Sequence, residues 1–320
     1  MNFEIRSSRY SRRAILKSGA LLGAGAALTP HLATAASVPS LPLIEKPIPS
    51  SGEKISVVGL GTNNYSVSAP DEIAKRSAVI KLMAELGGKV VDTAPAYGRS
   101  EETIGEIIAG LGNRKQLFLA TKVVARGGNL QESKASIDES FRRLRTDVID
   151  LLQVHNLQGV DELMPLLNEL KSARKIRYIG VTSSRTAQHG QMLDIMRRHR
   201  LDFIQVNYSI EDRDAADNVL SLAHDKGVAV LLNVPFGGRF GGGSVLKKVA
   251  DRPLPGWAAD IDAQSWAQLI LKYGVSHPAV VCAIPGTTDV KHMEDNLLAA
   301  RGRLPDAAMR KRMEQYWDSL

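Results

Sequence analysis

The sequence predicts an α/β fold, a single (β/α)8 barrel of the TIM type. Three polar residues carry this prediction, because Asp92, Lys122 and His155 each end an apolar run and lie 30 and 33 residues apart. That spacing is about one strand and helix unit. Their side chains are therefore expected at the carboxyl ends of successive parallel strands, with Tyr97 five residues beyond the first. In a closed barrel the loops at that end converge on one mouth, where chemistry is done.

The predicted strands are short apolar runs that alternate with helical segments. In order, the strands are ISVVGLGT (55–62), KVVDTA (89–94), LFLATKV (117–123), VIDLLQVH (148–155), IRYIGVTS (176–183), FIQVNYS (203–209), VAVLLNVPF (228–236) and AVVCAIPGT (279–287). Helices are expected at 69–86, from Ser100, from Ser133, at 161–173, after Ser183, at 215–226, at 263–273, and near residues 290 and 305. Gly87 and Gly88 stop the first helix, and Ser100 is expected to cap the second. Eight strands alternating with helices over about 265 residues fit this barrel.

An open, doubly wound sheet is the alternative fold. It would require the pattern G-x-G-x-x-G after the first strand. GLGTNN, which begins at Gly59, lacks the third glycine. The long loop from Gly237 to about Asp260 contains GGRFGGG and exceeds a plain connection, so a functional role is expected for it.

The first 35 residues resemble a twin-arginine export signal. Arg12 and Arg13 precede a glycine-rich apolar run at 19–28, and small residues at 33–35 suit a peptidase. A basic tail, or a membrane anchor if no cleavage occurs, is the alternative, although the run is far shorter than the roughly 20 residues that span a bilayer. We predict a signal peptide at 1–35, a linker with a possible hairpin at 36–54, and the barrel at 55–320. The expected location is periplasmic, with the export machinery as a partner and no stable membrane insertion after cleavage.

Charge and cysteine content exclude several functions. The net charge is +7, but residues 1–35 hold five basic residues and one acidic residue, so the remaining chain carries 7 − 4 = +3. No basic stripe with interleaved aromatic residues is present, and nucleic acid is not expected as a partner. Cys282 is the only cysteine and lies in an apolar strand, which rules out an intrachain disulfide. The histidines show no metal-ligand spacing, so no metal site is predicted.

The four rim residues suggest proton transfer to or from an oxygen atom. A phenol releases its proton near pH 10 in water, so it is a good donor at neutral pH only if its anion is stabilised. The ammonium of Lys122 would do this for Tyr97, and Asp92 would keep Lys122 charged against desolvation. His155 would orient a carbonyl oxygen. Because none of these groups moves electrons, hydride must come from a cofactor.

At these residues the chain resembles the aldo-keto reductase superfamily. The motifs GLGT, VDTAPAYGRSEETIG, LFLATK, IDLLQVH, IRYIGVTS, FIQVNYS and IPGTTDVKHMEDNL follow one another in the family's order over residues 53–300. The resemblance implies a barrel that binds NADPH or NADH across its rim and reduces aldehydes or ketones, or oxidises the alcohols. It also implies that Asp92, Tyr97, Lys122 and His155 are the catalytic tetrad, with Tyr97 as the acid.

The same resemblance implies which residues hold the cofactor. Thr182, Ser183 and Gln205 match the nicotinamide carboxamide site, and the loop from Phe236 to Gly243 matches the pyrophosphate cover. The full implied set is Gly61, Thr62, Asp92, Thr182, Ser183, Gln205, Asn233, Val234, Phe236, Gly237, Thr287, Thr288, His292, Asp295 and Asn296.

Two departures from the family pattern affect the cofactor. Asn233 stands where many members stack an aromatic residue on the nicotinamide, and Phe236 is one candidate to replace that stack. Gly286 and His292 stand where many NADP-preferring members carry Lys and Arg, although Lys291 is adjacent. A 2′-phosphate usually requires such cations. The sequence therefore favours NADP(H) over NAD(H) only slightly.

A second function remains open from the sequence alone. On the same barrel, a nucleotide-binding regulatory or accessory subunit would keep the tetrad with marginal turnover, because a fold does not fix a function.

Overall fold

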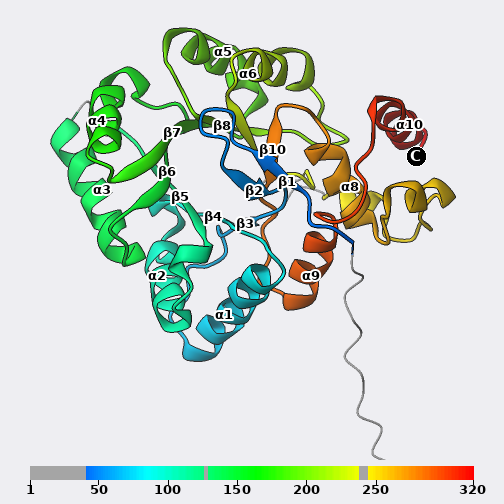
Figure 1. Ribbon diagram of the computed structural model, residues 1–320, viewed down its shortest axis with the longest axis horizontal. Coiled ribbons are helices and arrows are strands. Elements are labelled where there is room, and N and C mark those ends of the chain that lie inside the picture. Colours follow the sequence, from blue (N-terminus) through cyan, green and yellow to red (C-terminus); the bar gives the residue numbers. More distant parts are fainter. Residues whose placement is uncertain (1–40, 126–128, 238–243) are drawn as a thin grey trace, which may run out of the picture. The chain divides into compact units, whose positions relative to one another are not determined.

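The computed structural model describes residues 41–125, 129–237 and 244–320, which belong to one compact unit (Figure 1). At its centre lies an eight-stranded sheet in which every strand runs parallel to its neighbour in the order β3 to β10. The strands are β3 (Leu60–Gly61), β4 (Val90–Asp92), β5 (Phe118–Val123), β6 (Ile149–His155), β7 (Ile176–Thr182), β8 (Phe203–Asn207), β9 (Ala229–Asn233) and β10 (Val280–Ala283). Parallel bridges from Val58 to Ala283 and from Gly61 to Gly286 join the two edges. The predicted TIM-type barrel is confirmed.

Helices surround the strands in a ring (Figure 1). They are α1 (Pro70–Glu85), α2 (Ser100–Leu111), α3 (Leu130–Leu144), α4 (Val160–Ser172), α5 (His189–Arg198), α6 (Ser221–Asp225), α7 (Val245–Lys248), α8 (Trp266–Val275), α9 (Val290–Leu298) and α10 (Ala307–Asp318). Helix α3 begins three residues before the predicted Ser133, because the Asn129 side chain accepts the N–H groups of Gln131 and Glu132. The helix predicted at 215–226 is divided into a π-helical turn, η4 (Ala216–Leu220), followed by α6.

A hairpin closes the amino-terminal end of the barrel. Its strands β1 (Glu45–Pro47) and β2 (Lys54–Ser56) pair antiparallel, and Figure 1 shows the hairpin across one opening. The predicted first strand, 55–62, is therefore wrong in its extent, because Ile55 and Ser56 pair within the hairpin, whereas the chain from Val58 to Gly61 pairs with the barrel strands. Ile48 and Ile55 are fully buried against Phe118 and Phe203 inside the barrel. This apolar plug leaves the carboxyl end as the open mouth.

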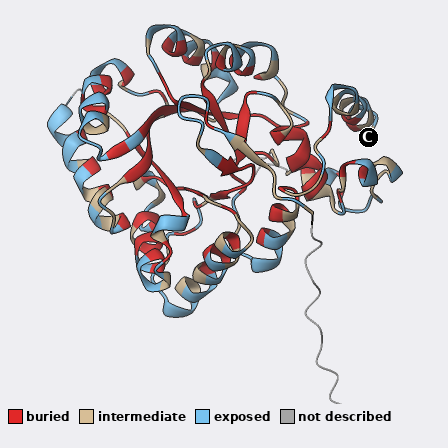
Figure 2. Ribbon diagram, viewed as in Figure 1, coloured by how far each residue is buried: buried red, intermediate tan, exposed pale blue. Residues whose placement is uncertain are grey.

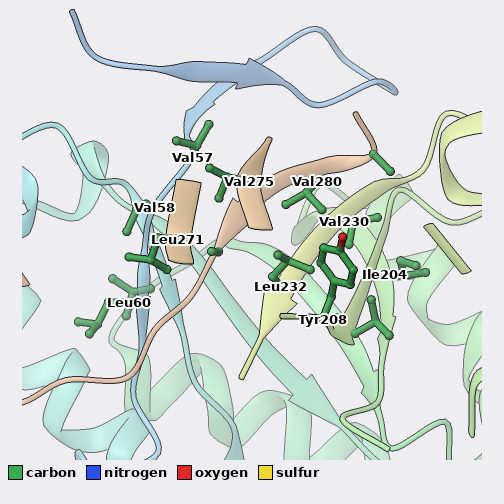
Figure 3. Packing of buried hydrophobic residues seen from close by; sticks show 14 of the residues in the cluster. Val57, Val58, Leu60, Ile204, Tyr208, Val230, Leu232, Leu271, Val275 and Val280 are labelled. Atoms are coloured by element: carbon green, nitrogen blue, oxygen red, sulfur yellow. The ribbon is translucent and has the colours of Figure 1, made fainter. Parts of the chain in front are cut away.

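Two apolar layers hold the strands in place. The smaller layer fills the barrel interior next to the hairpin. The larger layer lies between the strands and the helices, as Figure 3 shows for Leu232 on β9 and Leu271 on α8. Figure 2 shows burial on the strands and on the inward faces of the helices, with exposed residues outside. Inward side chains near the carboxyl ends are polar instead, which places the chemistry there.

The predicted export signal at 1–35 lies outside the described residues. Among the residues that are described, no helix has both the length and the apolar character needed to cross a membrane.

Candidate active site

A buried ion pair forms the base of the site. The Nζ atom of Lys122, on β5, donates to Asp92 Oδ2 at 2.7 Å and to the Thr93 carbonyl oxygen at 2.8 Å. Lys122 is 2% exposed and Asp92 is 3% exposed. Adjacent parallel strands bring the two together, because Asp92 ends β4 and pairs beside β5.

Lys122 stays charged despite its burial. Desolvation lowers its pKa, but the Asp92 carboxylate and the Tyr97 phenol outweigh this effect and raise the pKa above the ordinary 10.5. The ammonium is therefore a fixed positive charge at neutral pH, and it is not a free amine nucleophile.

Tyr97 and His155 complete the cluster from two other elements. Tyr97 ends the 3-10 turn η1 (Pro95–Tyr97), and its ring centre lies 5.0 Å from Lys122 Nζ. His155, the last residue of β6, meets the Tyr97 ring edge-on at 6.3 Å between centroids. The structure thus brings together all four residues that the sequence placed on the rim.

His155 is neutral at physiological pH. Burial lowers its pKa to about 4, and the charge of Lys122 adds to this effect. A neutral imidazole beside a phenol and an ammonium can donate a hydrogen bond to a bound carbonyl oxygen or accept one from a bound hydroxyl group.

The β3 end is tied to the ion pair through the backbone. The N–H and the hydroxyl of Thr62 both donate to the Asp92 carbonyl oxygen, at 3.0 and 2.8 Å, and Gly61 pairs with Asp92 in the sheet. The expected cap of α2 by Ser100 is wrong. Its hydroxyl instead donates to the Thr62 carbonyl oxygen at 2.9 Å and thereby braces the same corner.

Polar side chains of β7, β8 and β9 line the opposite side of the rim. Thr182 donates to Gln205 Oε1 at 2.6 Å, and the Asn233 amide donates to the Ser183 carbonyl oxygen at 3.1 Å. The Asn233 Oδ1 atom is buried and has no partner among the described residues. An acceptor in this state suits an N–H group of a bound ligand.

The segment after β9 borders a cavity of about 340 Å³. Val234 has a left-handed φ of 51°, and Gly237 has a φ of 60° and donates its N–H to the Val234 carbonyl oxygen. Both line the cavity together with Ser184, Arg185, Thr186, Asn207, Tyr208, Ser209, Glu211 and Asp212. The side chain of Phe236 packs against the apolar layer outside the barrel. Residues 238–243 of the predicted cover lie outside the described residues.

The last five residues of the implied cofactor set lie between the end of β10 and the second half of α9. Thr287 and Thr288 are half-buried, His292 is exposed, and Asn296 is buried. Asp295 accepts hydrogen bonds from Ser265 and Gln268 of the α8 region, both at 2.7 Å.

Two polar residues were missed by sequence reasoning. Gln153 donates to the second oxygen of Asp92 at 3.2 Å, and its inward position two residues before His155 was a usable signal. Asp289 caps α9 by accepting the N–H groups of Lys291 and His292, an aspartate placement typical of helix starts. The N–H group of His292, with that of Lys291, lowers the Asp289 pKa.

Trp257, in the long loop after β9, packs on α10. Trp257 lies 5.3 Å from the Arg312 guanidinium and meets Tyr316 edge-on, both on α10. Neither the cavity of about 340 Å³ after β9 nor a cavity of about 510 Å³ beside α10 is lined by a tetrad residue. No cluster of three or more histidine, cysteine, aspartate or glutamate side chains suited to a metal occurs in the described part of the chain.

Comparison with known proteins decides the family. The model of the aldo/keto reductase family matches residues 57–316, which include the whole barrel and all four rim residues. The chain belongs to the aldo/keto reductase family.

Individual relatives show how far the likeness extends. Aldo-keto reductase YhdN of Bacillus subtilis is 32% identical over 58% of this chain and 60% of its own length. Methylglyoxal reductase YeaE of Escherichia coli is 26% identical over 83% of this chain and 93% of its own. The match to the first of these relatives thus spans about 60% of its length.

Solved structures share the fold over most of the chain. An aldo-keto reductase from Bacillus halodurans in its holo form is 25% identical, with a TM-score of 0.68, and covers 86% of this chain and 96% of its own. An aldo-keto reductase from Klebsiella pneumoniae in complex with NADPH is 22% identical, with a TM-score of 0.69 and the same coverage.

Proposed function

We propose that this protein is an NADP(H)-dependent oxidoreductase that reduces an aldehyde or ketone, or oxidises the corresponding alcohol. The observation that carries the proposal is the placement of the Tyr97 ring 5.0 Å from the Lys122 ammonium, which Asp92 holds at 2.7 Å. An ammonium in this place stabilises the negative charge that develops on the phenol oxygen during proton transfer, and it does not act as a nucleophile.

Each rim residue has a distinct role in this proposal. Tyr97 donates its hydroxyl proton to the carbonyl oxygen of the substrate during reduction, and the Lys122 charge stabilises the phenolate that remains. Asp92 fixes the position and charge of Lys122. Neutral His155 donates a hydrogen bond to the same substrate oxygen and orients it.

The residues of the rim fit a nicotinamide cofactor. Asn233 Oδ1, which is buried and unpaired among the described residues, is an acceptor for a carboxamide N–H, beside Thr182, Ser183 and Gln205. When bound, the cofactor supplies the hydride that no side chain here can provide. NADP(H) is favoured because the Klebsiella structure contains NADPH and because a Schizosaccharomyces pombe relative, 25% identical over 81% of this chain, carries NADP(+) in its name.

Loss of NADPH absorbance with a panel of small aldehydes, methylglyoxal included, tests the proposal. Wild-type protein should turn over at least one of them, and Tyr97→Phe should lower kcat by roughly 100-fold or more, because one positioned acid contributes about that much. NADPH should bind the variant with unchanged affinity. Equal slow rates in both proteins would refute the enzymatic role and favour a nucleotide-binding accessory subunit.

We also propose export of the folded protein to the periplasm by the twin-arginine route. Arg12 and Arg13 before the apolar run support this proposal. Replacing both with lysine should leave the protein in the cytoplasmic fraction of a Gram-negative host. An unchanged distribution between fractions would contradict the proposal.

A further inference from the structure

Gln153 is a buried amide inside the barrel that the proposed mechanism leaves unused. Inward residues of β6 run from Leu151 in the apolar plug to Gln153 and then His155 at the rim. Gln153 is fully buried, and its Nε2 atom donates to Asp92 Oδ1 at 3.2 Å. Because Lys122 takes Oδ2, the two oxygens of the carboxylate have different partners from two different strands.

The orientation of this amide is dictated by its neighbour. A reversed amide would place its carbonyl oxygen against a carboxylate oxygen, which is repulsive. With the NH2 group toward Asp92, the Oε1 atom of Gln153 is buried without a partner among the described residues. An unpaired buried acceptor is unfavourable, and a leucine would avoid it. Contact with Asp92 is therefore what the amide contributes.

The neighbouring strand leaves room for this side chain. Gly180 on β7 is the register partner of Gln153. A Cβ atom at Gly180 would lie 3.2 Å from Gln153 Cγ and 3.0 Å from the Phe203 carbonyl oxygen. Glycine at this position allows the glutamine to lie across the barrel toward β4.

We propose that Gln153 is a positioning residue for the ion pair. By holding Oδ1, it turns Oδ2 of Asp92 toward Lys122 and keeps the ammonium beneath the Tyr97 ring. This inference rests on the proposed function for its effect on catalysis, but the contact itself does not. Besides Asp92 and Lys122 themselves, the titratable groups that face the pair are Tyr97 from η1, His155 from β6 and Cys282 from β10.

Gln153→Leu separates positioning from packing, because the side-chain volume is nearly kept. With an aldehyde that the wild type reduces, kcat should fall about tenfold, while KM and the NADPH Kd change less than about twofold. The alkaline limb of the pH profile should move to lower pH by about one unit, because a loosely held Asp92 supports the Lys122 charge less. Carbon-13 NMR of the lysine side chains should show the same downward shift for Lys122 without any turnover.

Gln153→Glu gives a second test, in which the loss of activity depends on pH. Only its protonated carboxyl can donate to Asp92, so activity should approach that of the wild type at acidic pH and decline as the new carboxyl ionises. Leu152→Ala is the matched control, because Leu152 directly precedes Gln153 on β6 and packs in the apolar layer between the strands and the helices. It should lower stability and leave the pH profile unchanged.

The outcomes distinguish the two proposals. Unchanged Lys122 titration and unchanged pH profile in Gln153→Leu would overturn the positioning role. A pH shift in Leu152→Ala equal to that of Gln153→Leu would also overturn it. A shifted Lys122 titration together with no turnover in the wild type would sink the proposed function alone.

Discussion

Breaking the ion pair between Lys122 and Asp92 should lower the free energy of unfolding far more than the loss of an exposed ion pair does. Lys122→Met removes one partner of a pair whose side chains are 2% and 4% exposed. At 2.7 Å and an effective dielectric constant of about 20, the attraction is roughly 6 kcal/mol before desolvation is counted. Since the variant leaves Asp92 buried without its counter-charge, the free energy of unfolding should fall by about 3–5 kcal/mol.

A double-mutant cycle measures this effect by urea unfolding at pH 7, followed by tryptophan fluorescence. Asp92→Asn should cost a similar amount, and the double variant should be about 2–3 kcal/mol more stable than the sum of the single losses predicts. Lys81→Met is the matched control, because the pair between Lys81 and Glu85 is exposed and 3.9 Å long, and it should cost less than about 0.5 kcal/mol. Additive losses at Lys122 and Asp92 would refute a formed buried pair.

Burial lowers the His155 pKa from 6.5 to about 4, so as the pH falls the unfolded chain takes up a proton on this residue before the folded protein does, and stability should be full above pH 6.5 and fall between pH 6.5 and 4. His155→Gln should flatten this slope in thermal unfolding, and an unchanged slope would contradict a neutral His155. Ile48→Ala, in the fully buried plug, should cost about 2–5 kcal/mol in urea unfolding while NADPH affinity stays the same; a loss below 1 kcal/mol would mean that the hairpin does not seal the barrel. Asp289→Asn removes a negative charge from the start of α9, so it should tighten NADPH binding roughly two- to fivefold in fluorescence titrations and leave NADH binding unchanged. Equal changes for both nucleotides would place the 2′-phosphate elsewhere.

Much of the site was accessible from spacing alone. Asp92, Lys122 and His155 were predicted at strand ends one unit apart, and the sheet places them on β4, β5 and β6. The reason is topological, because all eight strands run parallel and their carboxyl ends therefore lie on the same rim. Tyr97 followed because a short turn after β4 keeps it at that rim.

Other contacts depended on details that local patterns do not encode. Ser100 read as a helix cap, yet its hydroxyl bonds to Thr62, 38 residues away. The predicted first strand was divided because its start pairs with β1 and fills the barrel. Asn129 replaced Ser133 as the start of α3, since its side chain satisfied the free N–H groups.

The sequence by itself predicted the barrel and the four rim residues, because regular spacing of strands and helices without the G-x-G-x-x-G pattern of a doubly wound sheet favours a closed parallel barrel. Tertiary structure alone decided what holds the second oxygen of the Asp92 carboxylate. Gln153 reaches Asp92 across 61 residues, and the contact exists only because the register sets Gly180 beside Gln153 and leaves space for its side chain. Such contacts depend on distances across a closed sheet, and these are fixed only when all eight strands are in place.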